Sequence, residues 1–286
     1  MVKMTHTAAL TSSITSKRNV WRIAYLAILI LALVTRLYAL GDRATSHDET
    51  THAKYSWNLY SGRGFRHDPL MHGPLLFEAS ALFYFLFGVS DFTARLYTAL
   101  AGVALVMTPW LLRKWLGRIG ALSASVMLLI SPSISYYSRY TRHDIPLLVA
   151  TVVFFWAILQ YFADGRARWL RWMAAAFAFL YVTKENAYML TAIFGALLAA
   201  VFLWRVFTTP WAHPRMARWV LFCLAVALIA GAAFFVGLRG VQVSEEGEGN
   251  YDIGDVAIPP GSRLSLAAAL GLLTAALILT ARGLGE

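Results

Sequence analysis

The sequence predicts an all-α integral membrane protein, a polytopic helical bundle of about eight spans. Hydrophobic residues make up 59% of the 286 residues, and they gather in separate runs of about 17–22 residues, long enough to cross a bilayer as helices. Short polar breaks separate these runs, and the basic residues lie in small clusters at their ends. Such clusters are typical of membrane orientation, so the net charge of +10 does not indicate a nucleic-acid partner.

The first apolar run, residues 20–40, predicts an uncleaved first span. It follows Lys17 and Arg18, it is longer than the apolar core of a signal peptide, and no small-x-small cleavage site follows it. Residues 1–19 are therefore expected to form a cytoplasmic tail that is disordered over residues 1–16.

The next apolar run, residues 74–89, is expected to lie at the outer interface instead of crossing. It is short, it contains Glu78, and its crossing would place later basic clusters outside, against the positive-inside rule. The remaining expected spans are 92–112, 119–136, 145–163, 169–183, 187–206, 218–238 and 264–281. Both termini are then cytoplasmic, and the extracytoplasmic loops are 41–91, 137–144, 184–186 and 239–263.

The expected organisation has two parts after the tail 1–19. Residues 20–206 form a transmembrane module with the long first outer loop 41–91, which contains interfacial helices. Residues 207–286 add two further spans and the acidic outer loop 239–263. The single cysteine, Cys223, lies in an apolar run, so an intrachain disulfide is excluded and a packing role is expected.

The first outer loop carries adjacent carboxylates, Asp48 and Glu49, beside the membrane, where such groups are costly unless they are used. If residues 48–60 form a helix, Asp48 and His52 lie one turn apart on one face. That face suits a general base or a cation site. The plainer alternative is a solvated loop whose charges have no role.

The string HDETTH does not match a zinc protease, because that chemistry needs H-E-x-x-H on one helical face. A looser divalent-cation site remains chemically reasonable, with Asp48, Glu49 and His52 as ligands and His72 as a further donor. Beyond such a cation, no cofactor is expected.

Two arginines, Arg139 and Arg142, follow the tyrosines of YYSRYTRHDIP at an expected outer boundary. Arginines there suit a phosphate or pyrophosphate group; the alternative is that they are snorkelling anchors. Asp144 lies close by, and Lys184 and Glu185 add a polar point on the same side. The latter two could simply pair with each other.

Arg95 lies just inside an expected span and needs an acidic partner. The candidates are Asp48, Glu49, Glu78 and Asp91. Acidic groups, arginines and apolar helices together suggest an enzyme that uses a lipid-linked phosphate substrate at the extracytoplasmic surface.

Four ordered blocks resemble the membrane glycosyltransferases of the GT-C class, which include protein O-mannosyltransferases and the lipid A aminoarabinose transferases. The blocks cover about residues 46–190 and read SHDETTHAKYSWNLYSG, MHGPLLFEASALFYFLFGVSDFTARLYTALAG, SPSISYYSRYTRHDIPLLVA and FLYVTKENAYML. Within this class, the chain most resembles the flippase activity-associated membrane proteins. The resemblance implies a GT-C-like bundle in the cell (plasma or inner) membrane with its active site facing outside.

The resemblance implies transfer of a sugar from a polyprenyl-phosphate donor to a hydroxyl of a lipid, glycan or protein acceptor. Asp48 is the implied general base, Glu49 supports it or binds a metal, and Arg95 lies near both. In the aminoarabinose transferases a lysine helps to hold the lipid phosphate; His72 stands at about that place here. Phosphate binding is thus expected from Arg139, Arg142, His72 and Lys184, with support from His52, Arg95, Asp144 and Glu185.

The chain is shorter than its GT-C relatives, which continue through further spans. The expectations are a fragment, a truncated product, or a minimal module that needs a partner chain. A non-catalytic flippase-associated or transport protein is the rival function, in which the same arginines hold a lipid headgroup. A purely structural subunit leaves the outer polar cluster without a role.

Overall fold

The computed structural model describes residues 2–64, 72–208, 210–211, 214–238 and 260–283, which are helices and connecting turns without strands. The long N-terminal helix and the two that follow it are α1 (Val2–Leu37), α2 (His47–Tyr60) and α3 (Leu75–Phe87). The others are α4 (Asp91–Met107), η2 (Thr108–Trp110), α5 (Arg113–Ile130), α6 (Pro132–Ser138), α7 (Asp144–Asp164), α8 (Ala167–Thr183), α9 (Asn186–Thr208), α10 (Pro214–Leu238) and α11 (Pro260–Gly283).

Five helices are long and apolar enough to cross a membrane: α1 from Asn19, α4 extended to Trp110, α7, α9 and α10. The pair α5 and α6, bent by 64° at Ser131, counts as a sixth if it is one broken span. The other two expected spans fall in α8 and in the shorter apolar helix Leu264–Thr280. Their crossing stays a prediction. The apolar helices themselves make the chain an integral membrane protein.

Residues 2–16 differ from the expected disordered tail, because α1 begins at Val2 and runs without a break into the first span. This stretch contains no glycine or proline, so nothing in it interrupts a helix.

The chain divides into two compact units, residues 1–193 and residues 194–286. The division falls inside α9, whereas the sequence places the boundary after residue 206. In the second unit α10 packs along α11, and Val206, Val220, Cys223 and Ala276 form its core. Cys223 is therefore a packing residue. The acidic loop expected at 239–263 lies almost wholly outside the described residues.

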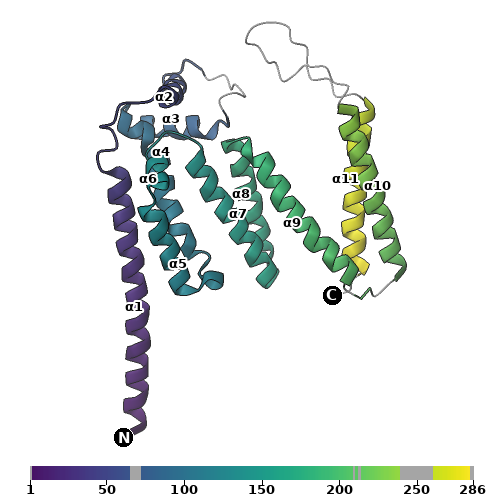
Figure 1. Ribbon diagram of the computed structural model, residues 1–286, viewed down its shortest axis with the longest axis horizontal. Coiled ribbons are helices and arrows are strands. Elements are labelled where there is room, and N and C mark those ends of the chain that lie inside the picture. The colour runs from purple at the N-terminus through teal and green to yellow at the C-terminus, as the bar shows by residue number, and fades with distance from the viewer. Residues whose placement is uncertain (1, 65–71, 209, 212–213, 239–259, 284–286) are drawn as a thin grey trace. The chain divides into compact units, whose positions relative to one another are not determined.

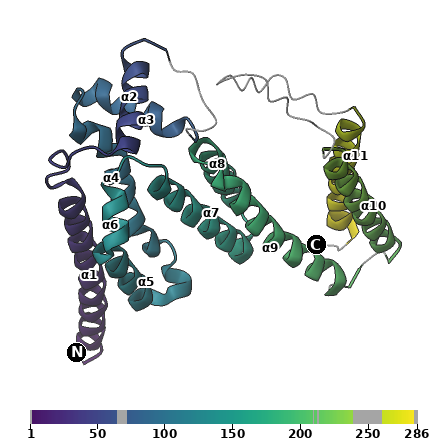
Figure 2. The ribbon, with the colours of Figure 1, turned by 45° about the horizontal axis from the view of Figure 1, so that its top comes forward.

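In the first unit, α4 is the central helix and packs against α1, α3, α5, α6 and α7. Gly102 of α4 permits a close approach of α6, because a Cβ at this position would collide with the Ser138 side chain. At one end of this bundle α2 and α3 pack together and lie across the ends of the longer helices (Figures 1 and 2). The run expected at the interface, 74–89, forms α3.

Local capping signals set the ends of the helices near this end of the bundle. Ser46 starts α2 and Ser90 starts α4, each through a reciprocal capping box with the residue three positions later. Gly88, at φ 82°, follows α3 in a conformation that favours glycine. The short break between α3 and α4 brings the first two turns of α4 beneath α2.

Candidate active site at the α2 and α3 end

Glu49 is buried where α2 meets α4 and is fully occupied by hydrogen-bond donors. The capping box turns its side chain back to the Ser46 N–H, at 3.2 Å. Arg95 Nε and Nη2 lie 2.9 and 3.2 Å from its two oxygens. Arg43 Nη2 donates at 2.8 Å and the Thr141 N–H at 3.2 Å. Burial opposes ionisation, but these donors outweigh it and hold the pKa of Glu49 below its usual 4.5.

Arg95 joins three segments through this carboxylate. Besides Glu49, its Nη1 donates to the carbonyl oxygens of Leu40, at 2.9 Å, and Arg43, at 3.0 Å. Both Arg95 and Glu49 are 1% exposed. Of the four acidic candidates, Glu49 is thus the one that pairs with Arg95. The pair fixes α2 and the preceding turn on the top of α4.

Asp48, the next residue along, has a different environment. Its side chain is 45% exposed and forms an ion pair with Arg142, which is 35% exposed. The two neighbouring carboxylates therefore point to different places: Glu49 into the protein, and Asp48 to the accessible surface beside the turn that follows α6.

Arg139 forms hydrogen bonds with backbone carbonyl groups at the end of α1. Its Nη1 and Nη2 donate to the carbonyl oxygens of Thr35, at 3.1 Å, and Ala39, at 2.9 Å. These carbonyls lie at the C-terminal end of a helix, where a guanidinium is favoured. Arg139 still lines a cavity of about 260 Å³ together with Leu40, Arg43 and Tyr136.

Aromatic rings connect this cavity to the Asp48 pair. The Arg43 guanidinium lies 5.2 Å from the Tyr136 ring and 5.1 Å from the Tyr140 ring. The Arg142 guanidinium lies 5.9 Å from the same Tyr140 ring. Tyr140 is thus shared by the two cations, so a cationic patch continues from the cavity to Asp48.

Three histidines pack together on the other side of Asp48. The His143 ring lies 5.3 Å from both His52 and His72, and His52 stacks on Phe77 at 5.4 Å. Burial, reinforced by the neighbouring His52, lowers the pKa of His143 to about 3. Burial likewise lowers the pKa of His52, so both rings are neutral at pH 7. His52 Nδ1 lies 2.7 Å from the Asp48 carbonyl oxygen, not from its carboxylate.

Gly73 holds the loop before α3 against α8. Its N–H donates to the Thr183 carbonyl at 3.2 Å, and its own carbonyl lies 3.1 Å from His143 Nε2. A Cβ at Gly73 would collide with the Val182 carbonyl. The close approach needs glycine and brings His72 next to the end of α8.

Lys184 and Glu185 each form an ion pair with a residue that is distant in the sequence. Lys184 Nζ lies 2.7 Å from Asp144 Oδ1, and Glu185 Oε2 lies 2.7 Å from His72 Nδ1. The alternative that Lys184 and Glu185 pair with each other is wrong for this structure, because they follow α8 and face different neighbours. The implied phosphate-binding groups His72 and Lys184 each already face a carboxylate.

The expected cation set of Asp48, Glu49 and His52 does not fit these positions. Glu49 is filled by Arg43 and Arg95, Asp48 faces Arg142, and His52 turns Nδ1 to a backbone carbonyl. Across the described ranges, no three histidine, cysteine or acidic side chains are grouped as metal ligands.

Several residues of this site are missing from the sequence prediction. Arg43 and the Thr141 N–H both donate to Glu49, and the Tyr140 ring lies beside the guanidinium groups of Arg43 and Arg142. Arg36, which is fully buried in α1, donates to the Leu128 and Leu129 carbonyls at 3.1 Å. One signal was available for Glu49: the spacing Ser46-x-x-Glu49 is that of a capping box, which directs the glutamate back toward the chain. The contacts of Arg43 and Tyr140 have no local signal.

Comparison with known proteins gives one family and one solved structure. The model of the family described as dolichyl-phosphate-mannose-protein mannosyltransferase matches residues 71–229. The crystal structure of ArnT from Cupriavidus metallidurans in the apo state matches with a TM-score of 0.52 and 16% identity, over 90% of this chain. The chain spans 59% of the length of that ArnT chain. A comparison with curated proteins found no match.

The likeness to ArnT confirms the predicted helical membrane fold of the GT-C class. The α2 segment with Asp48 and Glu49 precedes the residues matched by the family model. The more detailed resemblance to flippase activity-associated proteins stays a prediction.

Proposed function

Because the chain belongs to the dolichyl-phosphate-mannose-protein mannosyltransferase family, we propose that it transfers a sugar from a polyprenyl-phosphate carrier to an acceptor hydroxyl at the α2 and α3 end. The observation that carries the proposal is the environment of Asp48. This carboxylate is accessible and lies beside a patch of arginines, while its neighbour Glu49 holds α2 in place from below.

The arginine-rich side of Asp48 suits the carrier phosphate. Arg43 and Arg139 line the 260 Å³ cavity, and Arg142 lies beyond the shared Tyr140 ring. A guanidinium group can donate two parallel hydrogen bonds to one phosphate group, and it keeps its charge in a poorly hydrated environment. Their main effect would be on the leaving group, because they stabilise the negative charge that the departing phosphate gains.

Asp48 is then the general base. The acceptor oxygen attacks the anomeric carbon, a new C–O bond forms, and the bond from that carbon to the phosphate oxygen breaks with its electron pair on the phosphate. The proton of the acceptor hydroxyl passes to the Asp48 carboxylate. A single displacement of this kind inverts the anomeric configuration.

The ion pair with Arg142 gives the donor a way to activate Asp48. While the pair is intact, the Arg142 guanidinium occupies an Asp48 oxygen that would otherwise be open to the acceptor hydroxyl. A donor phosphate that takes Arg142 as its partner would free the Asp48 oxygens for the acceptor. His72 and Lys184, on the far side of His143, lie in reach of the polar part of a substrate, each held by its own carboxylate.

The test measures sugar transfer by the full chain in proteoliposomes supplied with a panel of radiolabelled polyprenyl-phosphate sugars. Hydroxyl acceptors of the lipid, glycan and peptide classes are offered in turn, and release of polyprenyl phosphate is followed alongside transfer. Asp48→Asn should reduce transfer by about 10²–10⁴-fold, the usual contribution of a general base. Donor binding should persist, because Arg43 and Arg139 remain.

The matched control is Asp91→Asn, which makes the same change at an exposed aspartate in the first turn of α4. It should leave transfer within a factor of about two, since surface substitutions have small effects. Full activity of Asp48→Asn would contradict the base assignment. Wild-type protein that moves the labelled donor across the vesicle membrane without releasing polyprenyl phosphate would favour the transport function instead.

A further inference from the structure

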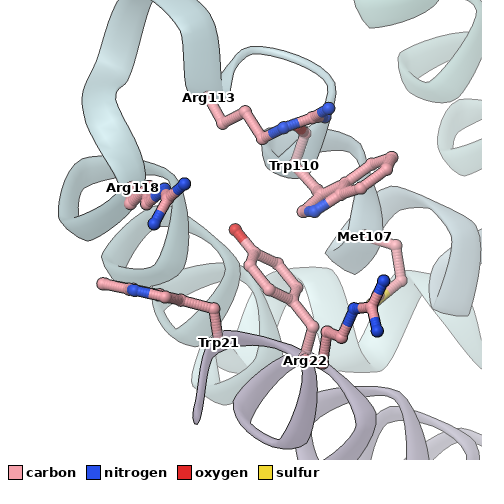
Figure 3. Close-up of a pocket in the computed structure, with 7 residues that line it drawn as sticks. Trp21, Arg22, Met107, Trp110, Arg113 and Arg118 are labelled. Atoms are coloured by element: carbon pink, nitrogen blue, oxygen red, sulfur yellow. The ribbon is translucent and has the colours of Figure 1, made fainter. Parts of the chain in front are cut away.

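A second cavity lies near the start of the membrane-spanning part of α1, between α1, η2 and α5. Its volume is about 530 Å³. Figure 3 shows its side chains gathered around a common space, and those used below are Trp21, Arg22, Tyr25, Trp110, Arg113 and Arg118. Arg22 precedes the end of α1 by 15 residues, so a helical rise of 1.5 Å per residue separates this cavity from the α2 end by about 20 Å.

A kink at Gly117 brings two of the arginines to this cavity. Gly117 has φ 70° and ψ 170° inside α5, a conformation that favours glycine. Arg113 and Arg118 lie on either side of the kink, and both line the cavity together with Arg22 (Figure 3). Arg113 Nη1 donates to the Trp110 carbonyl at 2.8 Å, and its guanidinium lies 3.8 Å from the Trp110 ring centre.

The three arginines lack acidic partners among the described residues. In the part of the chain that the structure describes, no salt bridge includes Arg22, Arg113 or Arg118. Three like charges around one cavity repel each other, and an anion placed among them removes that cost. The positive-inside rule requires basic residues at this end of the spans but does not require three of them to converge on one cavity.

The cavity also has the character of a membrane boundary. Trp21, Tyr25 and Trp110 are amphipathic aromatic residues of the kind found at the level of lipid headgroups. Most of its wall is apolar, and Arg22 and Tyr25 belong to the membrane-spanning part of α1. A ligand with an anionic group and an attached apolar chain fits both parts of this wall.

We propose that this cavity binds the phosphate group of an anionic membrane lipid, with Arg22, Arg113 and Arg118 around the phosphate and the aromatic residues against the glycerol and the start of the acyl chains. The ligand class is a phosphodiester lipid without a compensating ammonium group. The site is separate from Asp48 and does not depend on the proposed sugar transfer.

Native mass spectrometry of the full chain in detergent tests this assignment. The purified, delipidated protein is titrated with phosphatidylglycerol, phosphatidylcholine or glycerol phosphate. Phosphatidylglycerol should bind at least about tenfold more tightly than phosphatidylcholine. The triple substitution Arg22→Gln, Arg113→Gln, Arg118→Gln should weaken phosphatidylglycerol binding by about tenfold or more, because charge-assisted hydrogen bonds are lost.

The control protein carries Arg171→Gln, Arg215→Gln and Arg218→Gln, which removes the same charge from exposed positions that do not line the cavity. It should bind phosphatidylglycerol as the wild type does. Equal losses in both triple variants would overturn the site, because general surface charge would then explain binding. Binding of glycerol phosphate as tight as that of phosphatidylglycerol would overturn the lipid assignment. Circular dichroism checks that both variants remain helical.

Discussion

The Glu49–Arg95 pair and the Asp48–Arg142 pair begin at adjacent residues but have opposite environments. Both members of the first pair are 1% exposed, and further donors saturate the carboxylate. The members of the second are 45% and 35% exposed. A buried ion pair that loses one member leaves an uncompensated charge, whereas an exposed pair contributes little to stability. We therefore expect Glu49 to hold the site together and Asp48 to remain available for chemistry.

Arg95→Ala should have the largest effect on stability. The change leaves the Glu49 carboxylate buried without its bidentate partner and frees the Leu40 and Arg43 carbonyls. We expect the free energy of unfolding to fall by about 3–5 kcal/mol. Thermal unfolding of the detergent-solubilised protein measures this loss. Stability within about 1 kcal/mol of the wild type would show that the pair is not the anchor.

Acid should remove the stability that Glu49 contributes. The pKa of Glu49 is lowered on folding, so the stability it contributes is present above its unfolded pKa, near 4.5, and is lost as pH falls through the lower folded value. One such group gives a slope of at most about 1.4 kcal/mol per pH unit. Glu49→Gln should remove this part of the pH dependence.

Melting temperatures measured between pH 3 and pH 7 test the acid response, with Asp48→Asn as the matched control. The Asp48→Asn protein should keep the wild-type loss of stability in acid, because Glu49 is intact. If the two substitutions flatten the profile equally, the contrast between the carboxylates is wrong.

Arg142→Ala should have the smallest effect on stability, about 1 kcal/mol or less, because its ion pair is half exposed. Its effect on the proposed transfer should be much larger, since the variant lacks the partner of Asp48 that is proposed to bind the carrier phosphate. Thermal unfolding and release of polyprenyl phosphate, measured on the same preparation, separate the effect on stability from the effect on transfer. A destabilisation as large as that of Arg95→Ala would make Arg142 part of the anchor.

Much of the fold can be predicted from local features of the sequence. Apolar runs predict the helices, including α3 within residues 74–89; the interfacial position of that run stays a prediction. The resemblance to the GT-C class, and not a local feature, implies that Arg95 lies near the acidic pair, and Arg95 pairs with Glu49. The spacing of Ser46 and Glu49 contained the capping box that turns Glu49 inward, although the sequence interpretation did not use it.

The sequence by itself determined the helical membrane class and, apart from Arg43, the charged residues that meet at one end of the bundle, because hydropathy and helix caps act over a few neighbouring residues. Only the tertiary structure decided the partners. Arg95 and Glu49 are 46 residues apart, Arg142 and Asp48 are 94, and His72 and Glu185 are 113. Which of two adjacent carboxylates is buried depends on where α2 lies relative to Arg95 of α4, and helical periodicity contains no information about that placement.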